Sequence, residues 1–431
     1  MSTTRPTRTR IAAASLVGTA IEFYDFYIYG TAAALVLNTA FFPKLDELAG
    51  TLAAFATFAV AFVARPLGSA IFGHWGDRIG RKSMLVVSLL LMGASTVAIG
   101  LLPGYLTIGV AAPVLLVLLR FTQGIGLGGE WGGAALLATE HAPPGKRGLY
   151  AMYPQLGPSV GFVAANGFFL VLGGVLTDAQ FLAWGWRLPF LASLVLVVIG
   201  LYVRLKISET PVFQAAMEER RIARVPLAGL MRHQWRRVLL GAGAMVITYT
   251  LFYTATTYCL AYGTATLKIP RTTMLSLTMI GVVFMAVGTA VSSLVSDRVG
   301  RRRTLIVGTA VAIGWGLVMF PLMQTAAVPL VGLALAGALA LMGLIFGPMG
   351  AYLPELFRTE YRYSGASLAY SLGGVLGGAL PPLIATQMQA SGLPVFYVGV
   401  YVSAMAVLSL LCLLALPDTP KTGALETAWE Q

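Results

Sequence analysis

Six ionisable residues lie inside long apolar stretches of the sequence, where few water molecules are available to solvate a charge. They are Glu22, Asp25, Arg65, Arg120, Glu130 and, near the end of its stretch, Glu355. In a lipid bilayer, a charge at the centre of a helix costs about 2.5–3.5 kcal/mol even on the mildest insertion scale. These side chains must therefore face one another or a water-filled cavity, which makes them a predicted pathway for an ion or a polar solute.

The composition is that of a protein that crosses a membrane many times. The 431 residues are 57% hydrophobic and 11% charged, whereas a soluble domain is about 25% charged. Continuous apolar runs of about 20 residues, the length of a membrane-spanning helix, recur along the whole chain. Their continuity indicates helices and not the alternating strands of a barrel. We expect an all-α membrane protein with twelve transmembrane helices, at about 11–38, 51–74, 83–103, 107–138, 148–176, 184–205, 236–262, 272–295, 304–323, 328–353, 363–390 and 394–416.

The net charge of +12 could suggest a nucleic-acid partner, but the distribution of the charge argues against it. With the N-terminus placed in the cytoplasm, 23 of the 29 Lys and Arg residues fall in cytoplasmic segments and four in external ones. This asymmetry follows the positive-inside rule and predicts that both termini are cytoplasmic. We therefore expect a multi-pass protein of the cell (inner) membrane whose partner is the lipid bilayer.

A polar segment separates the first six expected spans from the last six. The predicted divisions are an N-terminal six-helix bundle at 1–205, a cytoplasmic linker at 206–235, a C-terminal six-helix bundle at 236–416 and a short cytoplasmic tail at 417–431.

The two halves contain matching motifs at nearly one offset. Asp77 and Asp297 open similar basic loops 220 residues apart, and Glu140 and Glu355 lie 215 residues apart. Each of these glutamates precedes an arginine by seven residues. Two independent matches indicate a parallel internal duplication.

The first expected span carries two carboxylates on one face. Glu22 and Asp25 are three residues apart, and at 1.5 Å per residue Asp25 lies about 20 Å from the cytoplasmic end, near the middle of the membrane. Two carboxylates in a poorly solvated site cannot both stay ionised cheaply, so at least one is expected to carry a proton near neutral pH. The alternative is that both pair with arginines and hold the bundle together.

Two arginines and a further glutamate lie in the expected spans that follow. Arg65 is about 18 Å deeper than the cytoplasmic loop at Asp77, and its planar fork suits a substrate carboxylate. Pairing of Arg65 with Glu130 or Glu22 is an equal alternative. Glu130 lies about 15 Å on the cytoplasmic side of Arg120, where a proton relay, an inner gate and a structural partner of Arg65 all stay open.

Polar and aromatic side chains are expected to complete a central cavity. Tyr249, Tyr253 and Thr257 recur at helical spacing and form one stripe, although ordinary packing is the alternative for each. Ser367, Tyr370 and Ser371 are weaker candidates. The predicted substrate-binding residues are Arg65, Arg120, Gln123, Tyr29, Tyr153, Gln155, Asn166, Tyr249 and Tyr253.

Charged residues at the cytoplasmic helix ends are expected to be gates. A carboxylate such as Asp77 or Asp297 can cap the N-terminus of a helix from the other half. Nearby basic residues can form salt bridges in one conformation and lose them in another. The predicted gating residues are Asp77, Arg78, Arg81, Asp297, Arg298, Arg301, Glu140, Arg147, Glu355 and Arg362.

Nothing in the sequence favours an enzyme. It lacks the phosphate-cradling loop of ATP-driven pumps, and it shows no catalytic triad and no cluster of metal ligands. We therefore expect no cofactor and no metal, with transport driven by the proton gradient.

Several motifs resemble those of a known superfamily. The Gly73-His-Trp-Gly-Asp77-Arg-Ile-Gly-Arg-Lys loop and its counterpart after Ser296 resemble the signature of the major facilitator superfamily. The segments around Glu22 and Asp25, Ala64-Arg65-Pro66 and Gly129-Glu130-Trp are similar to its metabolite:proton symporter branch. This resemblance covers essentially the whole chain. It implies two pseudo-symmetric six-helix bundles that rock around a central site.

The resemblance also implies a function. In related proton-coupled sugar carriers an aspartate and an arginine equivalent to Asp25 and Arg120 work together, so a protonated Asp25 would free Arg120 to bind an anion. The branch carries shikimate, 2-oxoglutarate, citrate, proline and betaine. We expect a monomeric, proton-coupled importer of a small carboxylate. A symporter of a zwitterion, a proton-driven exporter (Gly157-Pro158 partly resembles an antiporter motif) and a sensor with a carrier fold are the alternatives.

Overall fold

The computed structural model describes residues 8–79, 81–140, 142–143, 145–206, 226–358 and 361–418, and this part of the chain is almost entirely helical. Eleven helices of the described part are long and apolar enough to cross a membrane. Helix α1 has 28 residues and is about 42 Å long, which also exceeds the hydrocarbon thickness of a bilayer. The twelve predicted helices are therefore confirmed.

The N-terminal half supplies six spans. They are α1 (Arg8–Leu35), α3 (Glu47–Ile79), α4 (Arg81–Leu101), α6 (Ala111–Gly128) continued by α7 (Glu130–Glu140), α8 (Arg147–Val175) and α10 (Leu188–Lys206). Short helices connect some of them: α2 (Leu37–Phe41), α5 (Tyr105–Ile108), α9 (Asp178–Ala183) and the 3₁₀ turn η1 (Gly185–Arg187). Helix α12 (Pro226–His233) lies in the predicted linker, of which residues 207–225 are outside the described part.

The C-terminal half supplies the other six. They are α13 (Trp235–Tyr253) with η2 (Thr254–Tyr258) and α14 (Cys259–Ala265), α15 (Arg271–Val299), α16 (Arg301–Gln324), α17 (Val328–Glu355), α18 (Arg362–Gly374) with η4 (Val375–Ala379) and α19 (Leu380–Ala390), and α20 (Phe396–Ala415). Segments η2 and η4 are single π-helical turns inside their spans, a feature often found at functional sites.

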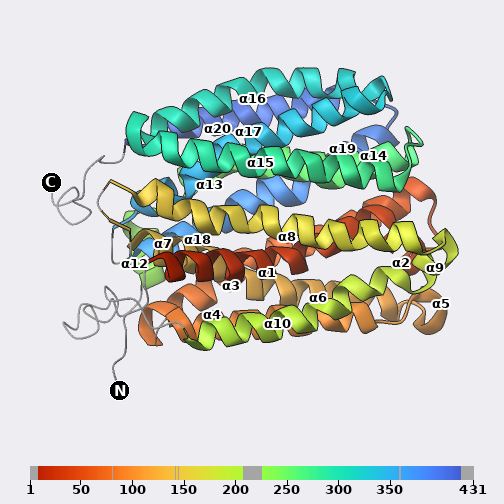
Figure 1. Cartoon of the computed structure of the whole chain (residues 1–431), viewed down its shortest axis with the longest axis horizontal. Coiled ribbons are helices and arrows are strands. Elements are labelled where there is room, and N and C mark those ends of the chain that lie inside the picture. The colour runs from red at the N-terminus through yellow and green to blue at the C-terminus, as the bar shows by residue number, and fades with distance from the viewer. Residues whose placement is uncertain are drawn as a thin grey trace.

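The long helices run side by side in two groups (Figure 1). Helices of the N-terminal half pack mainly on one another, as do those of the C-terminal half, while α8 meets α15 and α17, and α18 meets α3 and α7, across the boundary. The start of α1 and the end of α20 lie at the same end of the bundle, which we call the termini end (Figure 1).

Helices α3 and α6 approach each other along a stripe of glycines. A Cβ atom on Gly124 would lie 2.3 Å from the carbonyl oxygen of Ala61, and one on Gly128 would lie 2.2 Å from that of Arg65. These separations leave no room for a side chain, and small residues of this kind let helices pack backbone to backbone in a membrane. The contact therefore holds Arg65 and Arg120 on neighbouring helices in the core.

We expect Gly124→Ala to lower the stability of the protein, even though alanine is the better helix former. The added methyl group would meet backbone, which cannot move as a side chain can, and overpacking of this kind costs about 1–3 kcal/mol. Thermal unfolding in detergent measures the effect. Gly314→Ala in α16 is the matched control, because nothing lies within 4 Å of a Cβ there. Equal unfolding temperatures for the two variants would contradict the prediction.

Candidate functional site

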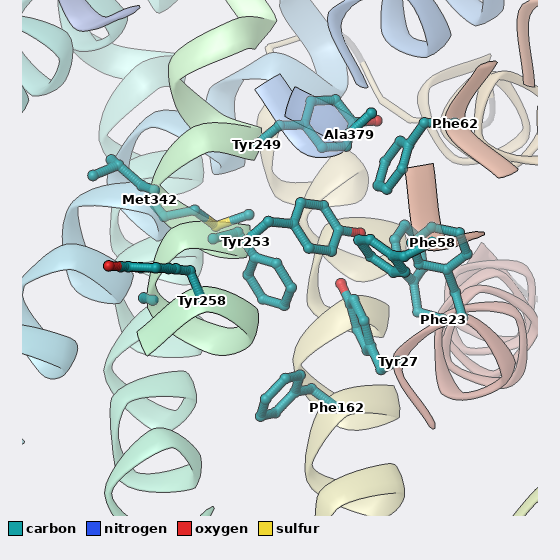
Figure 2. Close-up of a cluster of buried hydrophobic side chains, with 14 of the residues drawn as sticks. Phe23, Tyr27, Phe58, Phe62, Phe162, Tyr249, Tyr253, Tyr258, Met342 and Ala379 are labelled. Carbon is teal, nitrogen blue, oxygen red and sulfur yellow. The ribbon is translucent and has the colours of Figure 1, made fainter. Parts of the chain in front are cut away.

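A cluster of buried aromatic rings, which we call the central cluster, lies where helices of the two halves meet (Figure 2). Phe26 of α1 packs on Phe58 and Phe62 of α3 with ring centroids 5.3 and 5.0 Å apart. Tyr253 of α13 lies 5.4 Å from Phe58 and 5.1 Å from Phe62. The three phenylalanines belong to the N-terminal half and the tyrosine to the C-terminal half, so the cluster spans the boundary between them.

Arg65 of α3 is buried against this cluster at the boundary between the two halves. Its guanidinium carbon lies 5.5 Å from the ring of Phe62, 5.8 Å from that of Tyr249 and 5.2 Å from that of Tyr370. Its Nε and Nη1 are buried and have no hydrogen-bond partner. No ion pair of Arg65 with Glu22 or Glu130 is seen in the described part of the chain.

Arg120 is fully buried within the N-terminal half. It donates from Nη1 to Gln123 Oε1 and from Nη2 to the carbonyl oxygen of Phe58, and its guanidinium carbon lies 3.8 Å from the ring centroid of Tyr29. The Tyr29 hydroxyl in turn meets Thr57 Oγ1 at 2.5 Å. Two of the three guanidinium nitrogens of Arg120 therefore donate inside one bundle.

Asp25 is buried next to this group without touching Arg120. Its Oδ1 accepts a hydrogen bond from Ser193 Oγ, and its Oδ2 has no hydrogen-bond partner. Gln123 connects the two sites, because its Nε2 donates to the carbonyl oxygen of Asp25 and to Thr96 Oγ1. In this conformation the expected partnership of Asp25 and Arg120 runs through Gln123 and not through a salt bridge.

The remaining predicted cavity residues have varied surroundings. Asn166 accepts a hydrogen bond from Thr31 at 2.7 Å within the N-terminal half. Gln155 crosses the boundary, since its Nε2 donates to the carbonyl oxygen of Phe346 at 2.7 Å. Tyr153 is half-buried. Glu22 and Glu130 are both buried, as the sequence predicted for carboxylates in apolar spans.

The structure also brings together residues that the sequence did not single out. Trp131 donates to Gln155 Oε1 and stacks on Tyr370 with ring centroids 4.0 Å apart. Ser193, the hydrogen-bond donor to Asp25, is the lone serine in the apolar span α10, which has no threonine, and that isolation is the signal that could have identified it. Tyr370 was only a weak candidate from the sequence, yet it contacts Arg65.

Charged residues join the two halves at the termini end. Asp297 of α15 accepts hydrogen bonds from the backbone N–H groups of Gly148 and Leu149, at 2.9 and 3.1 Å. It thereby caps the N-terminus of α8, as the sequence suggested that such a carboxylate can. Glu355 lies 2.7 Å from Arg301 of its own half and 3.9 Å from Arg147 of the other half.

The other predicted gating residues are less informative. Arg298 is exposed, and Arg362 is buried and donates to the carbonyl oxygen of Phe357 at 3.4 Å. The side chains of four predicted gating residues lie outside the described part of the structure: Asp77, Arg78, Arg81 and Glu140.

Residues with hydroxyl groups form close contacts across the boundary between the halves, beside these charges. Ser69 of α3 meets Ser371 of α18 with the two Oγ atoms 2.7 Å apart, and Tyr363 donates to the carbonyl oxygen of Gly129. A Cβ on Gly132 would lie 2.0 Å from Ser367 Oγ. Helix α18 therefore packs tightly on α3 and α7, and in the described part of the chain the two halves are closed against each other at this end.

The opposite end is open. A cavity of about 500 Å³ lies there between the halves, lined by Asn38 and Glu47 on one side and by Tyr258 and Gln389 on the other. At its edge Arg271 forms a 3.0 Å ion pair with Asp178 across the boundary. A second cavity of about 10 Å³, room for roughly one water molecule, lies at the centre. The geometry is that of a carrier closed toward the termini end.

Comparison with known proteins agrees with this geometry. The sequence profile of the sugar (and other) transporter family matches residues 11–232 and matches again at residues 225–426. The chain belongs to this family. Because each half matches separately, the profile also supports the internal duplication. The protein is a membrane transporter of the major facilitator superfamily and not an enzyme.

Relatives of this transporter are metabolite carriers. It is 52% identical to the inner membrane metabolite transport protein YhjE of Escherichia coli K12, over 96% of this chain and 94% of that one. It is 37% identical to the shikimate transporter of the same organism, over 96% and 95% of the two chains. With the proline/betaine transporter of Salmonella typhimurium LT2 the identity is 34%, over 98% and 86%. The transporter is thus a multi-pass protein of the inner membrane.

Solved structures show the same fold. The proton:xylose symporter XylE bound to 6-bromo-6-deoxy-D-glucose superposes with a TM-score of 0.76, covering 97% of this transporter and 98% of XylE at 18% identity. At that identity the likeness establishes the major facilitator fold.

Proposed function

We propose that this transporter imports a small organic anion together with protons by alternating access, and that it works as a monomer. The observation that carries the proposal is that two buried groups of opposite charge do not neutralise each other. Among the described residues, Asp25 meets no guanidinium and Arg65 meets no carboxylate. A proton can neutralise the first group, and the carboxylate of a substrate can neutralise the second.

This arrangement supplies a physical reason for coupling. A buried charge without a partner is costly, because the protein interior solvates it poorly. A carrier loaded with both ligands buries fewer uncompensated charges than one loaded with a single ligand. The doubly loaded form therefore crosses the occluded state most easily, and each ligand promotes transport of the other.

A zwitterion is the second candidate substrate. The rings of Tyr249 and Tyr370 border the boundary at Arg65, and aromatic faces attract the cationic end of such a molecule. The similarity to a proline/betaine transporter supports this candidate, as the similarity to a shikimate transporter supports an anion.

Uptake by proteoliposomes tests the proposal. Vesicles containing the purified protein receive an inward proton gradient and labelled shikimate, 2-oxoglutarate, proline or betaine. We expect one anion to accumulate above its external concentration and a protonophore to abolish the accumulation. Accumulation of proline or betaine alone would identify the zwitterion carrier. Loss of preloaded substrate against the inward proton gradient would identify an exporter and overturn the proposal.

A further inference from the structure

Two buried arginines serve different ligands in this transporter. We infer that Arg65, with Tyr249 and Tyr370, binds a single carboxylate of the substrate. Arg120 does not touch the substrate and is a positioning residue of the proton site at Asp25. This inference rests on the proposed function. It assigns to Arg65 alone a role that the sequence left open to both arginines.

The first argument is position relative to the boundary between the halves. A carrier that exposes its site alternately to each side must bind its substrate between the two bundles. Arg65 is contacted from both: Phe62 belongs to the N-terminal half, and Tyr249 and Tyr370 belong to the C-terminal half. When the halves move, the surroundings of Arg65 must change.

Arg120 lies in a different setting. Its hydrogen-bond acceptors are Gln123 and Phe58, and its closest aromatic ring is that of Tyr29, all within the N-terminal half. This half can move as a unit without disturbing these contacts. Because Gln123 also bonds to the backbone of Asp25, Arg120 is linked to the proton site.

The second argument is the number of buried hydrogen-bond donors that have no acceptor. Around Arg65, the Nε and Nη1 groups and the hydroxyl of Tyr249 are buried without hydrogen-bond partners. Leaving such groups buried without a partner is unfavourable, and the oxygens of one carboxylate can accept hydrogen bonds from several of them. Arg120 has only its Nε without a partner, so it offers little to a second ligand.

The third argument is the separation of the two guanidiniums by aromatic rings. Phe26, Phe58 and Phe62 pack on one another. Arg65 contacts this phenylalanine cluster through Phe26 and Phe62, whereas Arg120 contacts it through Phe26 and Phe58. A substrate bound at Arg65 would have to displace these rings to reach Arg120.

The central cavity indicates the class of substrate. It adjoins the ring of Tyr249, and the rest of its wall is largely aromatic and thioether side chains, including Phe252, Met245, Met342 and Phe346. Such a wall suits an apolar or cyclic body. With one guanidinium on the substrate side, the site predicts a monocarboxylate and not a dicarboxylate.

Equilibrium binding to the purified full-length protein tests the assignment separately from transport. The probe is labelled shikimate, with proline, betaine and 2-oxoglutarate as competitors. Loss of a hydrogen bond to a charged group costs about 1.5–3 kcal/mol, so we expect Arg65→Lys and Tyr249→Phe each to raise the Kd by about ten-fold or more. Arg120→Lys should change the Kd less than about three-fold while abolishing proton-driven accumulation. Arg302→Lys, on the peripheral helix α16, is the matched control.

Tryptophan fluorescence gives a signature that a merely structural defect would not produce. Trp131 stacks on Tyr370, so binding at Arg65 should change its emission, and Trp131→Phe should remove that change without preventing binding of the labelled probe. Unfolding temperatures of all variants exclude loss of fold as the cause.

The outcomes separate this inference from the proposed function. Unchanged shikimate binding by Arg65→Lys, or its loss in Arg120→Lys, would overturn the assignment even if proton-driven uptake is observed. Arg65-dependent binding with no proton-driven uptake would overturn the proposed function and leave the site intact. Binding of 2-oxoglutarate in preference to every monocarboxylate probe, or binding of none of them, would overturn the substrate class.

Discussion

Replacing Asp25 by asparagine is expected to abolish proton-driven accumulation of the substrate while leaving its exchange across the membrane nearly intact. Asparagine has the shape of aspartate and can still accept the hydrogen bond from Ser193, but it cannot bind and release a proton. One pH unit corresponds to about 1.4 kcal/mol, or about ten-fold accumulation for one coupled proton. The variant should show an internal-to-external ratio near one under the same gradient.

Glu22→Gln is the matched control for this experiment, because it removes a second buried carboxylate three residues earlier on α1. Steady-state accumulation and counterflow in proteoliposomes are measured for both variants. If Asp25→Asn accumulates substrate as the wild type does, the proton is carried elsewhere. Loss of accumulation in Glu22→Gln alone would then transfer the role to Glu22, and normal behaviour of both variants would point to Glu130.

The sequence predicted the burial of these charges because the bilayer leaves them few alternatives. Asp25, Arg65 and Arg120 are far from the ends of apolar runs, so they had to turn inward. The burial of these charges does not determine which side chains they contact. Arg120 turns to Gln123, one turn away on its own helix, and sequence spacing alone does not decide between that neighbour and Asp25 on another helix.

The stripe of hydroxyl residues on α13 follows the spacing of an α-helix only as far as the π-helical turn. Tyr249 and Tyr253 face the central cluster and stack with their rings 9° from parallel, which agrees with the predicted spacing. The π-helical turn Thr254–Tyr258 then changes the register, because each turn of a π-helix contains more residues than an α-helical turn. At the end of this turn Tyr258 lines the open cavity, and the periodicity of the sequence does not predict the change of register.

Contacts between the halves were the least predictable part of the site. Ser69 and Ser371 are 302 residues apart, and a serine in a transmembrane helix usually satisfies its hydroxyl on its own backbone. The carboxylates were easier to predict, since Asp297 occurs at a helix end within a repeated motif. Charge at a helix terminus carries information that a small hydroxyl does not.

The second large effect is expected from Asp297→Asn, which should open the termini end. In the wild type both carboxylate oxygens accept backbone N–H groups at the start of α8. Asparagine keeps one acceptor oxygen and loses the charge that favours a helix N-terminus. Losing charge-assisted bonds worth about 1.5–3 kcal/mol would shift the ratio of closed to open forms by about ten- to a hundred-fold.

Labelling of a cysteine at Ser371 measures this shift. Ser371 lies in the sealed contact with Ser69, so a membrane-impermeant maleimide added at the termini end should react slowly with Ser371→Cys alone and much faster when Asp297→Asn is also present. Asp178→Asn is the control, since that carboxylate is 86% exposed at the opposite end and exposed ion pairs contribute little.

Equal labelling rates in all three backgrounds would mean that the hydroxyl contacts of α18, and not the cap on α8, hold this end closed. Because Glu355 still bridges Arg301 and Arg147 in the variant, a partial increase would assign the remaining closure to that network, and Glu355→Gln added to Asp297→Asn should then complete the opening.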